Sequence, residues 1–322
     1  MRQNYLSARI GILGMGRMSV GLAIDLALKK CRIDMIDLKN RSKEERRKYR
    51  ENLETECRNV LDILEIEADS FSFPVYRDRP GEALYDLVFE GLPEEIAIKQ
   101  DAYKSIRSNL KPNSILCSMT STFTIEELSR GIEPPLNVLV THFMNPPYLI
   151  PFLEVVTSPD IEPILVEQLF LFLRQAGHMP IKCKSSPGFV ISRLQLGLMN
   201  EAVRIMEEGV AAPEDIDKAI IFGWGYRFPI IGILEFIDSG GLDILYHAGR
   251  SVSKELNRSD LACPKQINEL FKQGAIGTKA LKGIFTYNSH QDVKRQALAK
   301  LKKQARIKTL LDQVHKEEGS WE

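Results

Sequence analysis

The sequence lacks long apolar runs, an excess of either charge, and cysteines in pairs or clusters. No uninterrupted apolar segment approaches the ~20 residues that a membrane helix needs, so we expect no membrane association. Lys and Arg total 43, and Asp and Glu also total 43, so the charge balance gives no indication of a nucleic-acid partner. The 5 cysteines, an odd number without metal-like spacing, indicate reduced thiols in the cytoplasm and no metal site.

The remaining composition is that of an ordinary globular protein. With 322 residues, 44% of them hydrophobic and 27% charged, the chain is long enough for two domains. Residues 1–5 lead directly into a short predicted strand, so we expect no signal peptide. The sequence shows no internal repeat and no low-complexity tract. Cys31 and Cys117 lie in apolar stretches, which predicts that they are small core residues.

A histidine and a glutamate stand at the centre of the pattern. Residues 137–140 and 152–156 are short apolar segments with prolines nearby, so both are predicted strands. His142 follows the first segment and Glu154 lies inside the second. A carboxylate so placed can fix one imidazole tautomer and leave the other ring nitrogen free to take a proton. From the spacing alone, a structural hydrogen bond between buried polar groups explains the pair equally well.

A glycine turn near the start of the chain is typical of dinucleotide binding. An apolar strand over residues 9–13 runs into Gly14 and Gly16, and helical periodicity follows. Such a turn offers backbone N–H groups and a helix dipole to a pyrophosphate. A second strand over residues 33–36 ends at Asp37, near the spacing expected of an acid that bonds the adenosine ribose.

The details of this turn favour NAD over NADP. Ser19 replaces the third glycine of the pattern, and its small side chain still permits close packing of strand and helix. The carboxylate of Asp37 repels the extra phosphate of NADP. Lys39 and Arg41 lie just beyond Asp37 and favour NADP, because their positive charges are placed to hold that phosphate.

Several polar side chains follow predicted strands. Residues 87–90 and 114–117 are further short apolar segments. In an open parallel sheet, ligands collect at the carboxyl ends of the strands. Glu94, Ser121 and His142 all fall there, together with the glycine turn. This convergence favours an active site over the structural interpretation of His142.

A charged helix is predicted over residues 41–62, with an apolar stripe at Leu53, Val60 and Leu61. A solvated face is the simpler explanation of its many charges. The alternative is a cradle for a phosphate-bearing substrate.

The chain changes character after its last predicted strand, at residues 179–183. Residues 184–188 break the pattern, and amphipathic helical periodicity follows. We therefore predict an α/β protein: a Rossmann-type, mostly parallel sheet domain at residues 1–185, followed by a smaller all-helical domain at residues 186–322.

Within the second part, helices are expected over residues 189–208 and from Pro213, with loops at residues 223–226 and 238–241. A small helical domain beside a Rossmann domain often supplies substrate contacts and a dimer interface. A homodimer is therefore expected.

These motifs resemble those of the L-3-hydroxyacyl-CoA dehydrogenase family over nearly the whole chain. The stretches that carry the resemblance are residues 14–18, 90–99, 118–121, 141–147, 152–156, 186–190, 200–202, 214–217 and 277–287. Together these motifs are specific, although no single one would be.

The resemblance implies a reaction and its catalytic residues. His142 would be the general base, Glu154 its orienting partner, and Ser121 a hydrogen-bonding partner of the reacting oxygen. A secondary alcohol would be oxidised as His142 takes the hydroxyl proton and hydride leaves for NAD. Such general-base help is worth ~10²–10⁴-fold in rate.

The same resemblance implies the cofactor contacts. Glu94 and Lys99 would bond the ribose, Asn145 would place the nicotinamide, and Lys279 would reach back to the cofactor. The residues implied to bind NAD are Gly14, Met15, Gly16, Arg17, Met18, Asp37, Glu94, Lys99, Asn145 and Lys279.

Two departures from the family pattern concern the substrate. Ser192 stands where the family has an Asn, and its shorter side chain implies a reshaped catalytic site. The family's CoA-binding serine and lysine align with Asn52 and Asn59, although Arg58 is a candidate substitute. This region is more similar to members that act on non-CoA substrates, such as the pyridine-carboxylate dehydrogenase of vitamin B6 breakdown.

Three functions are therefore open, each with a small-molecule ligand. The favoured one is NAD-dependent oxidation of an L-3-hydroxyacyl-CoA thioester to the 3-oxoacyl-CoA. The second keeps the hydride chemistry but acts on a non-CoA hydroxy acid or hydroxymethyl compound. The third is a non-catalytic NAD-binding protein like the related lens crystallin, against which the presence of Ser121, His142 and Glu154 argues.

Overall fold

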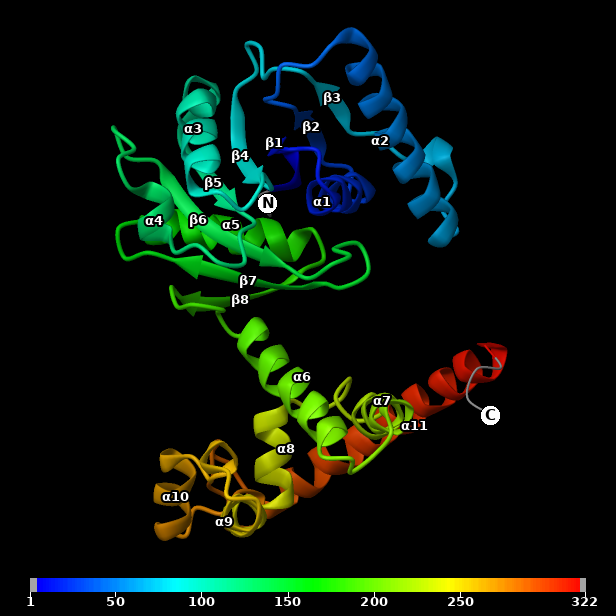
Figure 1. Cartoon of the computed structure of the whole chain (residues 1–322), viewed down its shortest axis with the longest axis vertical. Coiled ribbons are helices and arrows are strands. Elements are labelled where there is room, and N and C mark those ends of the chain that lie inside the picture. Colours follow the sequence, from blue (N-terminus) through cyan, green and yellow to red (C-terminus); the bar gives the residue numbers. More distant parts are fainter. Residues whose placement is uncertain (1–4, 319–322) are drawn as a thin grey trace. The chain divides into compact units, whose positions relative to one another are not determined.

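The computed structural model describes residues 5–318 (Figure 1). Residues 1–4, part of the segment expected to lead into the first strand, lie outside the described residues. The chain divides into two compact units, Met1–Met199 and Asn200–Glu322. In the described part of the chain, no helix combines the length and apolar character that a bilayer crossing requires.

One sheet organises the first unit. Its strands among the described residues are β1 (Arg9–Leu13), β2 (Arg32–Ile36), β3 (Val75–Arg77), β4 (Tyr85–Glu90), β5 (Leu110–Ser118), β6 (Asn137–Phe143), β7 (Phe152–Thr157) and β8 (Met179–Lys184). The strand order is β3-β2-β1-β4-β5-β6-β7-β8. Neighbouring strands are parallel except β6 and β7, which run antiparallel. The predicted Rossmann-type, mostly parallel sheet is therefore confirmed.

The core of this unit lies along the central strands. β1, β2 and β4 bury runs of successive residues, as expected of parallel strands that are covered on both faces. Cys31 and Cys117 belong to this core, as the sequence predicts.

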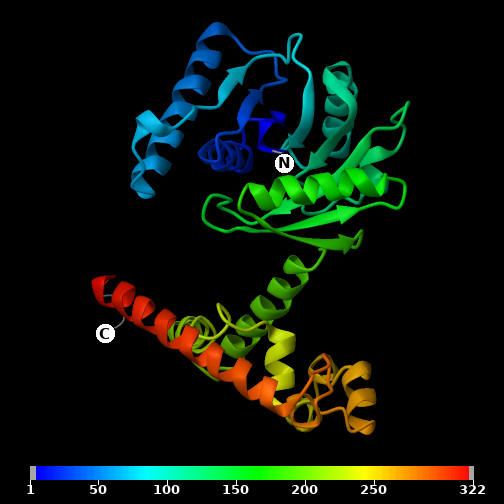
Figure 2. The same ribbon diagram turned by 180° about the vertical axis from the view of Figure 1, so that it is seen from behind.

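Helices connect the strands of the sheet. They are α1 (Arg17–Leu28), α2 (Lys43–Ile63), α3 (Ile96–Ile106), α4 (Ile125–Ser129) and α5 (Pro163–Gln175), with short 3-10 turns at Tyr5–Ser7, Ala68–Ser70 and Arg107–Asn109. Capping boxes start two of them: Ser42 pairs with Glu45 at α2, and Thr124 pairs with Glu127 at α4. Figure 2, the view from behind, shows α5 in front of the sheet, whereas Figure 1 shows it behind β6.

The regular elements described in the second unit are helices, and two isolated β-bridges join Gly277 to Lys282 and Lys282 to Thr286. After α6 (Ile191–Glu207), which begins in the first unit, come α7 (Pro213–Lys218), a π-helical segment (Ala219–Trp224), α8 (Ile233–Gly240), α9 (Leu242–Glu255), α10 (Lys265–Lys272) and α11 (His290–Glu318), with 3-10 turns at Ser259–Leu261 and Thr278–Ala280. The helix predicted over residues 189–208 is confirmed as α6. The helix predicted to begin near Pro213 is confirmed as α7, with Pro213 in its first turn.

Both predicted loops of this unit are wrong in part. Gly223 belongs to the π-helical segment, and Asp238 belongs to α8. The Asp238 carboxylate is buried, and it accepts hydrogen bonds from the backbone N–H groups of Ile284 and Phe285, each at 2.9 Å. Partners distant in the sequence thus overrode the local turn composition.

The predicted domain boundary at residues 185 and 186 falls just before α6, and the division between the compact units falls inside that helix. Both boundaries place the whole sheet in the first part of the chain and α7 to α11 in the second part.

Candidate active site

The glycine turn follows β1 and is held by backbone hydrogen bonds to two neighbouring strands. The Gly14 N–H donates to the Ile36 carbonyl at 3.0 Å, and the Gly91 N–H donates to the Leu13 carbonyl at 3.0 Å. Gly14 has a φ of +98°, and a Cβ there would lie 2.9 Å from the Gly91 carbonyl oxygen. The turn therefore requires glycine.

The α1 helix begins directly after this turn. Its N-cap, Gly16, has no side chain to cap the first N–H groups, so these donors remain available to an anion. The turn and the 12-residue helix together fit the pyrophosphate of a dinucleotide.

Asp37 lies at the end of β2 and is largely buried. Its carboxylate binds the Arg41 guanidinium and accepts hydrogen bonds from the Lys39 N–H (3.1 Å) and the Tyr76 hydroxyl (3.3 Å). Arg41 also lies over the ring of Tyr49, 4.0 Å from its centroid. Asp37 and Arg41, the two residues that oppose each other in the choice between NAD and NADP, are thus ion-paired.

A fully buried carboxylate, Glu90, organises the end of β4. Its Oε1 accepts hydrogen bonds from the Leu92 N–H (2.6 Å) and from Lys99 Nζ (2.8 Å). Its Oε2 accepts from the hydroxyls of Tyr103 (2.8 Å) and Ser118 (2.7 Å). Burial and the neighbouring Glu90 carboxylate raise the pKa of Tyr103 well above its usual range, so its hydroxyl remains a donor. Glu90 was not among the site residues predicted from the sequence, although a charged residue that ends an apolar strand is a usable signal.

The predicted pair Glu94 and Lys99 lies beside this network. Lys99 is 1% exposed and its Nζ lies 3.2 Å from the more exposed Glu94 carboxylate. Glu94 also accepts a hydrogen bond from the buried Thr120 hydroxyl, a residue that the sequence analysis missed. Lys99 is therefore placed to orient Glu94. Ser121 follows Thr120 and is exposed.

His142 and Glu154 lie directly opposite each other on the antiparallel strands β6 and β7. His142 Nδ1 is 2.8 Å from Glu154 Oε2, so the meeting expected from the sequence occurs. Glu154 is fully buried, whereas the His142 side chain is 14% exposed. An ionised carboxylate only accepts hydrogen bonds, so beside an ionised Glu154 a neutral imidazole carries its proton on Nδ1 and its lone pair on Nε2.

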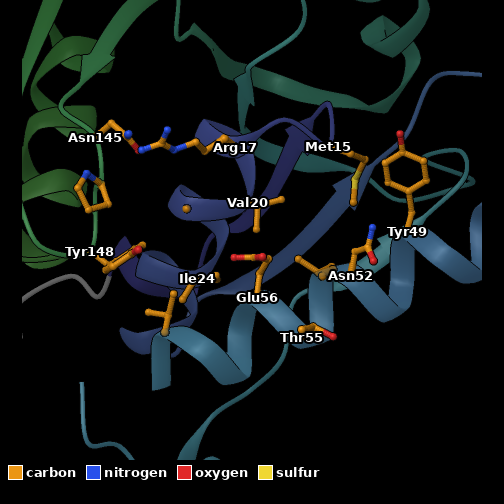
Figure 3. Close-up of a pocket in the computed structure, with 14 residues that line it drawn as sticks. Met15, Arg17, Val20, Ile24, Tyr49, Asn52, Thr55, Glu56, Asn145 and Tyr148 are labelled. Atoms are coloured by element: carbon orange, nitrogen blue, oxygen red, sulfur yellow. The ribbon is translucent and has the colours of Figure 1, made fainter. Parts of the chain in front are cut away.

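Asn145 follows β6 and faces the glycine turn. With its amide oxygen toward Arg17, it accepts hydrogen bonds from Nε (3.3 Å) and Nη2 (2.6 Å) of that guanidinium. Figure 3 shows the two side chains pointing toward each other at one end of a cavity. Both residues were predicted from the sequence to bind the cofactor, but their contact with each other was not predicted.

The cavity has a volume of about 600 Å³ and lies between α1, α2 and the connection that follows β6. Asn52 and Glu56 enter it from α2, and Arg17 enters it from the start of α1. Met15 enters it from the glycine turn and Tyr148 from the β6–β7 connection (Figure 3). Of its lining residues in the described structure, Arg17 is the one cation.

Two predicted site residues lie further along the chain. Ser192 is half-buried in the first turn of α6. Lys279 belongs to the second unit, where its Nζ lies 3.2 Å from Asp243 and helps to lower the pKa of that carboxyl. Contact between Lys279 and the cofactor stays a prediction.

Comparison with known proteins identifies the family. Residues 9–186 match the family described as 3-hydroxyacyl-CoA dehydrogenase, NAD binding domain, and residues 188–287 match 3-hydroxyacyl-CoA dehydrogenase, C-terminal domain. The chain belongs to the 3-hydroxyacyl-CoA dehydrogenase family. It is an NAD-dependent oxidoreductase of this family, as the resemblance of its motifs implies.

Members of the 3-hydroxyacyl-CoA dehydrogenase family similar to this chain differ in substrate. The 5-formyl-3-hydroxy-2-methylpyridine 4-carboxylate 5-dehydrogenase of Mesorhizobium japonicum is 33% identical over 293 residues, which is 89% of this chain and 93% of that protein. The mitochondrial hydroxyacyl-coenzyme A dehydrogenase of Sus scrofa is 31% identical over 203 residues, 63% of this chain and 64% of that protein. A solved 3-hydroxyacyl-CoA dehydrogenase of Archaeoglobus fulgidus aligns with a TM-score of 0.74 and 26% identity, covering 94% of this chain and 99% of that one.

Proposed function

We propose that this enzyme oxidises an alcohol with NAD, using His142 as the general base. The supporting observation is the buried Glu154 carboxylate on His142 Nδ1, which leaves Nε2 to accept the hydroxyl proton. NAD, when bound, accepts the hydride from the carbinol carbon. The imidazolium that forms remains paired with Glu154, which stabilises its charge.

We propose that the cofactor is held by the glycine turn, Asp37 and Glu94. Residues 14–18 would supply N–H groups to the pyrophosphate, and the two carboxylates would accept hydrogen bonds from ribose hydroxyls. Ser121 would contact the reacting oxygen, and Asn145 would support the nicotinamide.

For the substrate, we favour a non-CoA hydroxy acid or hydroxymethyl compound over an acyl-CoA thioester. The α2 helix presents the neutral Asn52 and the anionic Glu56 to the cavity, and neither attracts phosphate groups. Arg58, the candidate substitute for the family's lysine, is hydrogen-bonded to Glu54 at 2.7 Å. The Mesorhizobium relative, which matches over most of its length, acts on a pyridine carboxylate by its name.

Steady-state kinetics with NAD would test the substrate class. A panel of hydroxy acids and hydroxymethyl pyridine carboxylates would be compared with 3-hydroxybutyryl-CoA at equal concentrations. Higher kcat/KM on a free acid is the expected result, and higher kcat/KM on the thioester would restore the acyl-CoA assignment. NADH binding without turnover on any compound would instead favour a crystallin-like role.

We also propose that the chain forms a homodimer through an apolar stripe on α6. Leu196, Met199, Val203 and Met206 are 43–57% exposed, and their spacing of three and four residues aligns them along the helix. Buried apolar residues described in the second unit are few: Leu242, Ile267 and Ala275.

Light scattering would test the dimer. Val203→Glu places a charge in the stripe and should give monomers, whereas Ser105→Glu, which adds the same charge to the exposed α3 surface, should not. A monomeric wild-type protein at micromolar concentration would contradict the dimer.

A further inference from the structure

The turn that precedes α6 has an unusual backbone. Gly188 and Phe189 both have positive φ values, +73° and +45°. A bulky residue such as phenylalanine rarely adopts this conformation, and such strain persists only where the surrounding contacts impose it. Phe189 is 3% exposed, and the centroid of its ring lies 5.8 Å from that of the His142 imidazole.

The turn directs two backbone donors at the partner of His142. The N–H groups of Val190 (2.6 Å) and Ile191 (2.8 Å) both donate to Glu154 Oε1. The Val190 carbonyl accepts the first hydrogen bond of α6, from Leu194 at 3.1 Å, so Val190 is the N-cap residue and Ile191 the first helical residue. Glu154, from a distant strand, therefore caps this helix.

The two carboxylate oxygens of Glu154 thus have different hydrogen-bond partners. Oε1 is engaged by the two N–H groups of the helix start, and Oε2 accepts from His142 Nδ1. With Oε1 fixed, rotation of the carboxylate would break both capping bonds, so Oε2 stays in line with the imidazole. The carboxylate also has favourable electrostatic interactions with the positive end of the helix dipole.

We propose that the Gly188–Phe189 turn and the first N–H groups of α6 are a positioning element for His142. They act through Glu154, which they lock in the orientation that keeps the proton on Nδ1 and the lone pair on Nε2. Phe189 limits the tilt of the imidazole from its side. This inference rests on the proposed function, because it assigns a role to the surroundings of the general base.

The contacts of Glu154 with His142 bear on proton transfer in the reaction. As the substrate O–H bond breaks, its proton goes to Nε2, while the hydride of the carbinol carbon passes to NAD and leaves a carbonyl group. The positive charge of the imidazolium then faces the negative Glu154 carboxylate through Nδ1–H, and the two backbone donors hold that carboxylate in place. A loosened Glu154 should therefore lower kcat and leave the binding of NAD unchanged.

Replacing Ile191 with proline removes one donor, and the proline Cδ takes the place of the N–H hydrogen, so Glu154 Oε1 must also move away from its 2.8 Å contact. Proline suits the first position of a helix because the N–H there has no partner within the helix. This chain already uses proline in the first turn of α5 and α7. Ile191→Val is the matched control, since it trims the side chain and keeps the N–H.

Two readouts test the proposal. We expect Ile191→Pro to lower kcat about tenfold, a fraction of the ~10²–10⁴-fold that a general base supplies, with the KM for NAD unchanged. In a proton NMR spectrum, the downfield signal of His142 Nδ1–H, assigned by its absence in His142→Gln, should shift or broaden in Ile191→Pro and persist in Ile191→Val. Wild-type kcat together with an unchanged signal in Ile191→Pro would overturn the proposal.

A second variant covers the case in which Ile191→Pro does not fold. Phe189→Leu keeps an apolar side chain and removes the ring beside His142, and it should lower kcat with the KM for NAD unchanged. Unaltered kcat in a folded Phe189→Leu protein would then overturn the proposal. Turnover retained in His142→Gln would instead contradict the proposed function, and the NMR comparison would still report on the positioning element.

Discussion

The Ser19 side chain fills the space that a side chain on residue 91 would need. The Ser19 hydroxyl, in the place of the third glycine of the pattern, lies 3.4 Å from the Gly91 carbonyl oxygen. A Cβ on residue 91 would clash with the Ser19 hydroxyl and with the Met119 methyl group. The extra atoms at residue 19 are thus accommodated by glycine on the adjoining loop.

This relationship predicts a coupled pair of substitutions. Gly91→Ala should destabilise the protein by about 1–3 kcal/mol, as overpacking does, because Ser19 is buried and cannot move away. Ser19→Gly should have little effect alone and should recover part of that loss in the double variant, since only the flexible Met119 would remain in contact. Urea unfolding of the three variants measures the coupling, and strictly additive effects would contradict it.

The second prediction concerns the His142–Glu154 pair. His142→Gln should lower kcat by ~10²–10⁴-fold and keep NADH affinity. Glu154→Gln should lower kcat by a smaller factor than His142→Gln does. Its amide oxygen would accept from Val190 and Ile191, so its NH₂ group would face Nδ1 and favour the wrong tautomer, yet a base would remain. Kinetics and NADH titration measure both variants, and wild-type turnover in His142→Gln would refute the mechanism.

The third prediction concerns cofactor choice. The wild-type enzyme should bind NADH more tightly than NADPH, because Asp37 is negative and occupies Arg41. Asp37→Ala should narrow that preference by freeing the Arg41 guanidinium for a phosphate. Adding Arg41→Ala should remove the gain in NADPH affinity. Fluorescence titration with both nucleotides tests this series, and tighter NADPH binding by the wild type would show that Arg41 dominates.

The fourth prediction concerns Ser192. The family's Asn carries a carboxamide where Ser carries a hydroxyl, so it is longer by about one bond, and a difference of about this size shifts discrimination between substrates by ~10–200-fold. Ser192→Asn should therefore depress kcat/KM on the native substrate if the site is shaped for a non-CoA compound. It should hold or raise activity on 3-hydroxybutyryl-CoA. No effect on either substrate would mean that Ser192 does not face the reacting carbon.

The sequence alone was sufficient for features that depend on neighbouring residues. The glycine turn, Asp37 at a strand end and the helix over 189–208 follow from φ requirements and from periodicities of two or 3.6 residues. The mostly parallel sheet follows from the alternation of apolar strands with helices, since such strands must be covered on both faces. Each of these features depends on residues close together in the sequence, and the structure contains all of them.

Apart from the meeting of His142 and Glu154, which the sequence predicts, tertiary structure decided which polar groups meet. The antiparallel register that sets His142 opposite Glu154 depends on the connection between β6 and β7, which no periodicity encodes. The four partners of Glu90 come from three separate segments, and the helix that Glu154 caps begins far beyond it in the chain. Asp238 was assigned to a loop because its distant backbone partners were invisible in the sequence. A buried carboxylate takes the donors that the assembled fold places around it, so its partners are fixed only when the strands and helices have packed.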